Sequence, residues 1–105
     1  AADSARRFEA TRAFFRSPYV AELDPVGVAS ALQGTAVSLL IYFDPLDTRC
    51  LALRPLVVLA AERLADEANI RVGAVRCNTD ADTDTLCREH RVTRWPSFHA
   101  VGANG

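Results

Sequence analysis

Cys50 is the side chain in this sequence that is best placed for chemistry. It follows a short apolar run at residues 37–43 and an Asp-Pro turn signal, and it lies in the first turn of a long helical pattern that begins at Asp47. The first turn of a helix stabilises anions, including thiolates. Dithiol exchange needs two sulfurs within bonding reach, and the Asp47-Thr48-Arg49-Cys50 segment supplies one. We therefore consider two hypotheses, a partly buried unreactive cysteine and a single thiol that forms mixed disulfides with client proteins.

Asp47 stands where the predicted helix starts, three residues before Cys50. A carboxylate at this position accepts backbone N–H bonds and faces the positive end of the helix dipole. Its negative charge is expected to raise the pKa of a thiol one turn away. The sequence thus predicts Asp47 as a helix N-cap, and this prediction weakens the single-thiol hypothesis.

A metal site is the alternative use of the other cysteines and of the histidines. Cys77, Cys87, His90 and His99 supply suitable ligand atoms, but their spacing matches no zinc pattern, and His99 falls on a predicted strand. We predict no metal site and no cofactor. Cys77 and Cys87 remain open to two interpretations, a disulfide or two reduced and buried thiols.

Length and composition indicate one ordinary globular domain. The chain has 105 residues, of which 50% are apolar and 24% are charged, and its net charge is −1. No apolar run approaches the ~20 residues that a bilayer-spanning helix needs. The charge gives no reason to expect nucleic acid or an anionic membrane surface as a partner.

Strands and helices are expected to alternate along the chain. Short apolar or alternating runs predict strands at residues 19–23, 37–43, 70–77 and 97–101, and only Ser38 of the second run is expected to face solvent. Helical patterns cover residues 26–32 and 47–69, and a third helix is expected to be capped by Asp82 or Thr83 and to end near His90. Residues 1–18 form a charged segment that we interpret as an N-terminal extension or linker. The order β-α-β-α-β-α-β predicts an α/β sheet with helices on both faces.

The segment around Cys50 resembles the active-site unit of the thioredoxin superfamily, in the style of protein disulfide isomerase and quiescin sulfhydryl oxidase. Those proteins carry a frame similar to V-E-F-Y-A-P-W-C-G-H-C with a proline five residues later. Here the frame is Ile41-Tyr42-Phe43-Asp44-Pro45-Leu46-Asp47-Thr48-Arg49-Cys50, followed by Pro55. The resemblance places Cys50 at the second cysteine and implies a thioredoxin-like fold over residues 19–105. The last strand and helix of that fold would follow the final residue, so we expect either an excerpt of a longer protein or missing pieces supplied from elsewhere.

Three departures from the family frame fall at functional positions. Asp47 replaces the nucleophilic cysteine, Leu46 replaces the tryptophan before it, and Ile41 replaces a buried glutamate that helps move protons in the family. The resemblance therefore implies a redox-degenerate site. It also permits the alternative that a working C-x-x-C lies elsewhere in a parent protein.

The resemblance also extends to the second half of the chain. Quiescin sulfhydryl oxidase and several isomerase relatives carry cysteines where Cys77 and Cys87 stand, which implies a structural disulfide that contributes roughly 2–3 kcal/mol. Such a disulfide implies the endoplasmic reticulum lumen or secretion, whereas reduced cysteines would imply the cytoplasm. In the same region Arg91 replaces a glycine that ends a helix in the family, and a left-handed backbone there would cost about 1 kcal/mol.

Trp95-Pro96 aligns with the cis-proline turn that faces the active site in thioredoxin folds. In the family the backbone before this proline pairs with extended client peptides, so Trp95 and Pro96 are candidate polypeptide-binding residues. Alternatively, the tryptophan fills or covers that groove, or packs on the helix start as part of a structural turn. Two functions follow from the sequence: a non-catalytic domain that binds a polypeptide or partner domain, or a thiol-disulfide exchange enzyme that uses Cys50.

Overall fold

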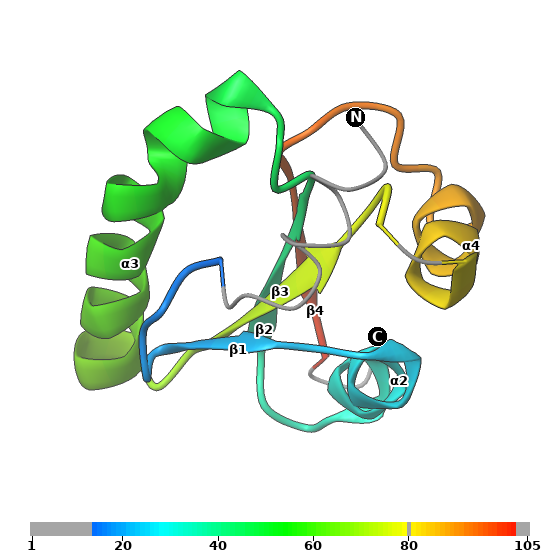
Figure 1. The fold of residues 1–105 in the computed structure, drawn as a ribbon. Helices are drawn as coiled ribbons and strands as arrows, with labels where there is room; N and C mark the ends of the chain where they lie inside the picture. The colour runs from blue at the N-terminus through cyan, green and yellow to red at the C-terminus, as the bar shows by residue number, and fades with distance from the viewer. Residues whose placement is uncertain (1–13, 80, 103–105) are drawn as a thin grey trace.

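The computed structural model describes residues 14–79 and 81–102, and strands and helices alternate through this part of the chain (Figure 1). The elements in order are β1 (Val20–Glu22), α2 (Pro25–Gln33), β2 (Ser38–Phe43), α3 (Thr48–Ala68), β3 (Arg71–Arg76), α4 (Ala81–Glu89) and β4 (Ser97–Val101). The predicted order β-α-β-α-β-α-β is confirmed, and most bounds differ from the expected ones by one residue.

The four strands form one sheet in the order β1-β3-β2-β4. β3 pairs in parallel with both β1 and β2, while β4 runs antiparallel to β2. The carboxyl ends of β2 and β3 therefore meet at the same edge of the sheet, where each strand leads into a loop. In the described part of the chain, β1 and β4 are the outer strands.

Helices cover both faces of this sheet, as the sequence predicted (Figure 1). α3 lies on one face and packs over a core cluster that includes Ile41 and Phe43 of β2. On the other side α2 and α4 cover a second cluster, which includes Leu40 and Tyr42 of the same strand. This division follows from the alternation of side chains along a strand.

Phe14 and Phe15 belong to the core, although the sequence placed them in the N-terminal extension. Their side chains are 3% and 7% exposed, and the Phe14 ring stacks on Phe43 with centroids 4.7 Å apart. The Arg54 guanidinium lies over the Phe14 ring, 4.9 Å from its centroid. The packed core thus includes residues that precede position 19. Burial of the two large aromatic rings stabilises this arrangement. The expected helix cap at Asp3 or Ser4 lies outside the described residues.

Ser38 was expected to face solvent, and this expectation was wrong. Its side chain is 9% exposed, whereas Val37 just before the strand is 39% exposed. β2 begins at Ser38, and the strand alternation turns this side chain toward the same face as Leu40 and Tyr42. The hydroxyl is consequently buried beneath α2.

The start of α4 also differs from the prediction. The helix begins at Ala81, so Asp82 and Thr83 lie inside its first turn and do not cap it from outside. Two aspartates, Asp82 and Asp84, occupy this turn, where negative charge is favoured by the helix dipole. The Asp84 carboxylate accepts a hydrogen bond from the backbone N–H of Asn78, which ties the helix to the end of β3.

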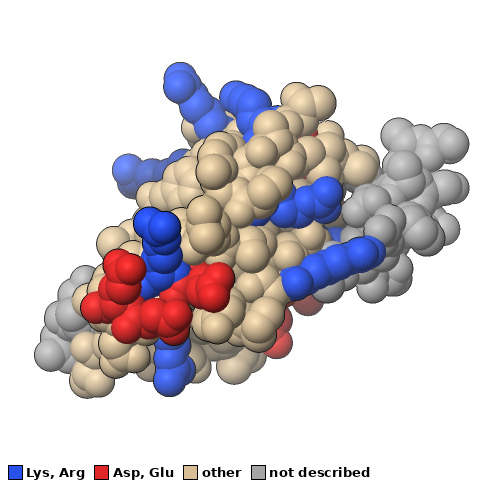
Figure 2. Space-filling view, turned by 90° about the vertical axis from the view of Figure 1, so that its left-hand side faces the viewer, with Lys and Arg blue, Asp and Glu red and all other residues tan. Residues whose placement is uncertain are grey.

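Charged side chains are unevenly placed on the face that carries α3. Figure 2 shows acidic side chains gathered at one end of this face, with basic side chains spread over the remainder. No helix among residues 14–79 and 81–102 has the length and apolar character needed to cross a membrane.

Candidate functional site

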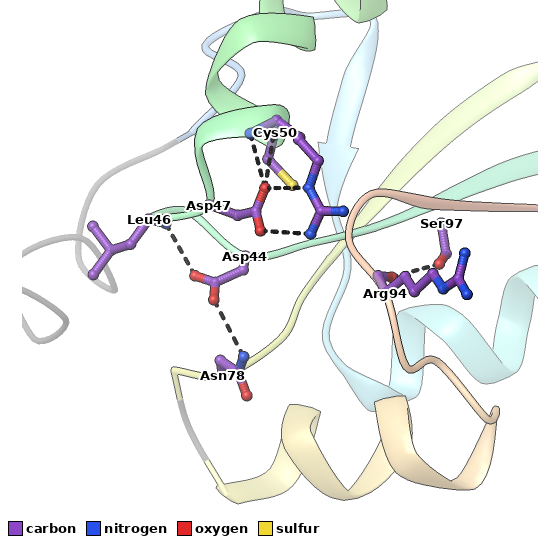
Figure 3. Close-up of polar contacts among 8 residues, drawn as sticks. Asp44, Leu46, Asp47, Cys50, Asn78, Arg94 and Ser97 are labelled. Atoms are coloured by element: carbon purple, nitrogen blue, oxygen red, sulfur yellow. Dashed lines mark hydrogen bonds and ion pairs between the residues drawn. The ribbon is translucent and has the colours of Figure 1, made fainter.

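The loop from β2 to α3 places Asp47 at the N-cap of α3, as predicted (Figure 3). Its carboxylate accepts hydrogen bonds from the backbone N–H groups of Arg49, at 2.8 Å, and of Cys50, at 3.3 Å. These donors would otherwise be unsatisfied in the first turn of the helix. The Asp47 carboxylate therefore lies at the position where the start of the helix would otherwise stabilise a nucleophilic thiolate.

Arg49 binds the same carboxylate through its side chain. Its Nε and Nη2 atoms lie 3.3 Å and 3.1 Å from the two Asp47 oxygens. The side-chain hydrogen bond from Arg49 is the main cause of the lowered pKa of Asp47, and the two backbone hydrogen bonds contribute in the same direction. The pair thus keeps a negative charge on Asp47 at neutral pH and partly neutralises it.

Cys50 is a buried free thiol, 3% exposed and packed in the cluster beneath α3. Burial raises its pKa, and the carboxylates of Asp47 and Asp44 add to this effect. The thiol is therefore neutral at physiological pH and shielded from solvent. Both properties oppose nucleophilic attack, since the thiolate is the reactive form.

Asp44 organises the loop between β2 and α3, a role that was not predicted from the sequence. This buried carboxylate accepts hydrogen bonds from the Leu46 backbone N–H, at 3.0 Å, and from the Asn78 amide, at 3.2 Å (Figure 3). Its backbone oxygen accepts from the N–H of Asp47, at 3.1 Å. The loop is thereby joined to the end of β3. The signal in the sequence was the Asp-Pro turn, because an aspartate often hydrogen-bonds the backbone two residues ahead.

Ile41 lies below the site and is 2% exposed. It belongs to the same apolar cluster as Cys50, and its strand neighbours are Ala74 and Phe98. A hydrocarbon side chain has no proton to give or accept. Ile41 therefore contributes packing and cannot carry a proton, which is the role of the glutamate at this position in the family frame.

The loop that holds Trp95 and Pro96 lies at the same end of the sheet as the start of α3 (Figures 1 and 3). The Trp95–Pro96 peptide bond is cis, and the Ser97 hydroxyl donates a 2.6 Å hydrogen bond to the Arg94 carbonyl oxygen. Trp95 is half-buried and packs against both core clusters. Its indole N–H has no hydrogen-bond partner in the described part of the chain.

Cys77 and Cys87 form a disulfide with an S–S distance of 1.99 Å, as the resemblance implied. Both sulfurs are buried in the cluster beneath α2 and α4, and the bond joins the end of β3 to α4. Because the sulfurs are bonded to each other, they are not available as thiolate ligands for a metal. His90 instead has its Nδ1 atom 2.6 Å from the Tyr42 hydroxyl.

The backbone just beyond α4 is left-handed at Arg91, a conformation that favours glycine. Arg91 has a φ angle of +59°, in the left-handed region. The strain predicted for a non-glycine residue at this position is thus present in the structure.

Comparisons with known proteins identify the fold. No protein-family model and no curated protein sequence matches the chain. Among solved structures, the J-Trx1 fragment of ERdj5 is 23% identical with a TM-score of 0.72, and the match covers 82% of this chain and 39% of that one. The first two thioredoxin domains of Saccharomyces cerevisiae Eps1p are 20% identical with a TM-score of 0.68, and 80% of this chain and 31% of that one are covered.

A thioredoxin structure that this chain covers more fully has the same fold. Thioredoxin from Trypanosoma brucei brucei is 12% identical with a TM-score of 0.73, and the match covers 90% of this chain and 79% of that one. The predicted thioredoxin-like fold is therefore confirmed. The chain spans about a third of the ERdj5 and Eps1p structures that it matches.

Proposed function

We propose that this thioredoxin-like chain, whose packed core includes Phe14 and Phe15, is a redox-inactive domain that binds a polypeptide or partner domain within a larger disulfide isomerase-like or sulfhydryl oxidase-like protein. The observation that carries the proposal is the Asp47 carboxylate at the start of α3, held by two backbone N–H groups and by Arg49. Dithiol exchange requires a sulfur at this place. A carboxylate that caps a helix and pairs with an arginine cannot take part in thiol-disulfide exchange.

The state of Cys50 supports the same proposal. Exchange by a single thiol would require an accessible thiolate, and Cys50 is buried with a raised pKa. The disulfide between Cys77 and Cys87 leaves no other free sulfur in the described chain. An exchange reaction at this site would therefore need structural opening around Cys50 before any chemistry.

The proposed binding surface includes Trp95, Pro96 and the start of α3, which lie at the same end of the sheet (Figure 1). Leu46 there is 37% exposed, and the Arg49 side chain is 64% exposed. An apolar side chain, a cation and a half-buried indole provide non-covalent contacts for a polypeptide without any cysteine.

The disulfide supports a location in an oxidising compartment. Such bonds persist in the endoplasmic reticulum lumen and outside the cell, and they are rare in the cytosol. We therefore propose the endoplasmic reticulum lumen or the extracellular space as the site of action.

The catalytic half of the proposal is tested by insulin reduction in the presence of dithiothreitol. The natural chain and its Cys50→Ser variant are compared with a reaction that contains no protein. We expect all three rates to agree. A rate above the background that the Cys50→Ser substitution abolishes would support the single-thiol enzyme and overturn our proposal.

The binding half is tested with carbamidomethylated α-lactalbumin, a permanently unfolded polypeptide, by fluorescence anisotropy. Substitutions Trp95→Ala and Leu46→Ser are expected to weaken binding at least several-fold, because both remove apolar contact area. Val26→Ala serves as the matched control, since Val26 is 74% exposed on α2. The absence of binding by the natural chain, or equal affinity in all variants, would refute this surface.

A further inference from the structure

A cavity of about 500 Å³ lies between α2 and the sheet. Its lining includes Leu23, Ala31, Ser38, Leu40, Arg71 and Gly73. The residues at the start of α3 do not contribute to it. Its volume falls within the range of small-molecule sites, which are mostly apolar with a few convergent polar groups.

Gly73 allows two leucine side chains to lie close against the sheet at the floor of this cavity. It lies on the same strand and face as Arg71, two residues along, and contributes no side chain. A Cβ atom at this position would stand 2.5 Å from Leu23 Cδ1 and 3.2 Å from Leu40 Cδ2. The two leucines therefore extend over the glycine and form apolar walls. On the helix side the lining is small, with Gly27 and Ala31.

Two polar side chains of the cavity lining, Ser38 and Arg71, lie at the start of β2 and of β3. Ser38 is paired in register with Arg71, so the two side chains project from the same face of adjacent strands. Ser38 is 9% exposed, and its hydroxyl and the Arg71 guanidinium are polar groups of the cavity lining.

Arg71 is the charged group of this cavity. It is exposed, it forms no ion pair with an acidic residue of the described chain, and the lining contains no aspartate or glutamate. Leu40, by contrast, is fully buried. The cavity thus has a cationic, hydroxyl-bearing end and an apolar interior.

We propose that this cavity binds a small amphiphilic monocarboxylate. The carboxylate accepts hydrogen bonds from the Arg71 guanidinium and the Ser38 hydroxyl, a pairing for which guanidinium geometry is well suited. The hydrocarbon chain lies against Leu23 and Leu40. A monoanion fits best because the lining supplies one cation. This site is separate from the proposed polypeptide-binding surface and does not depend on it.

The test uses octanoate as the probe and the oxidised chain, with amide chemical shifts measured by NMR spectroscopy. Saturable shifts are expected at Leu23, Ala31 and Gly73. Arg71→Gln should weaken octanoate binding at least about fivefold, as expected for loss of a charge-assisted hydrogen bond. The neutral analogue octanamide should bind both proteins with similar affinity. Arg63→Gln, an exposed arginine of α3, is the matched control and should leave octanoate binding unchanged.

A second variant tests whether the ligand occupies the cavity, independently of the charge on Arg71. Ala31→Leu adds bulk from the helix side and should abolish binding of both octanoate and octanamide, while the circular dichroism spectrum stays that of the natural chain. Three results would overturn the proposal: no saturable shifts around the cavity, equal effects of Arg71→Gln and Arg63→Gln, or undiminished octanoate binding by a folded Ala31→Leu protein.

Discussion

Reduction of the Cys77–Cys87 disulfide is expected to destabilise the domain by about 2.7 kcal/mol. The two cysteines are separated by 10 residues, and the chain-entropy relation for a loop of about this length gives that free energy at 25 °C. Both sulfurs are buried, at 1% and 3% exposure, and reduction removes no heavy atom from the core. The loss therefore reflects mainly the greater freedom of the unfolded chain. It is a large share of the 5–15 kcal/mol typical of a folded domain.

The assay is urea unfolding followed by the fluorescence of Trp95, the single tryptophan, with and without a reductant. A Cys50→Ala background prevents disulfide exchange, and its own effect cancels because both redox forms carry it. With a urea dependence of roughly 1–2 kcal/mol per molar, the midpoint should fall by about 1.4–2.7 M on reduction. Mass spectrometry of alkylated protein verifies the redox state of each sample. A difference in unfolding free energy below about 0.5 kcal/mol between verified samples would refute the reasoning.

Three further predictions concern single side chains. Asp47→Ala should cost about 1 kcal/mol through loss of the N-cap. Because the folded pKa of Asp47 is lowered, the charge-dependent part of its contribution is complete above the unfolded pKa and is lost as the pH falls through the folded one. Thermal unfolding of both proteins against pH checks this, and a stability gap that does not narrow in strong acid would contradict it. Arg91→Gly should stabilise by up to about 1 kcal/mol by relieving the positive φ angle, and a lower melting temperature would contradict that strain. Tyr42→Phe should cost about 1 kcal/mol by removing the hydrogen bond to His90, and unchanged stability in urea would show that this bond contributes nothing.

The fold could be predicted from sequence because its signals are local and agree with one another. Apolar runs mark β2 and β3, Asp47 caps α3, and the alternating order of elements implies the layered sheet. Burial of Phe14 could not be predicted from local sequence signals. Arginines stand two residues before and two residues after it in the sequence, and Phe43, the ring on which it stacks, lies far along the chain.

At the candidate site the sequence predicted the helix cap and did not predict the contacts of the loop before it. The N-cap role of Asp47 depends on the first turn of a helix, so spacing alone indicates it. The contacts of Asp44 with Asn78 and the burial of Ser38 depend on the register between strands, which no local pattern specifies. The cavity beneath α2 was missed for the same reason, since Gly73 has meaning only beside Leu23 and Leu40.

The central claim, that the fold is retained while its thiol chemistry is lost, is tested most directly by the alkylation rate of Cys50 in the native chain. Iodoacetamide labelling at neutral pH is followed by mass spectrometry, in parallel with the urea-unfolded chain. We expect native Cys50 to react at least about tenfold more slowly, because burial raises its pKa and blocks access of the reagent. Native labelling as fast as in the unfolded chain, or a mixed disulfide already present on Cys50, would contradict the account.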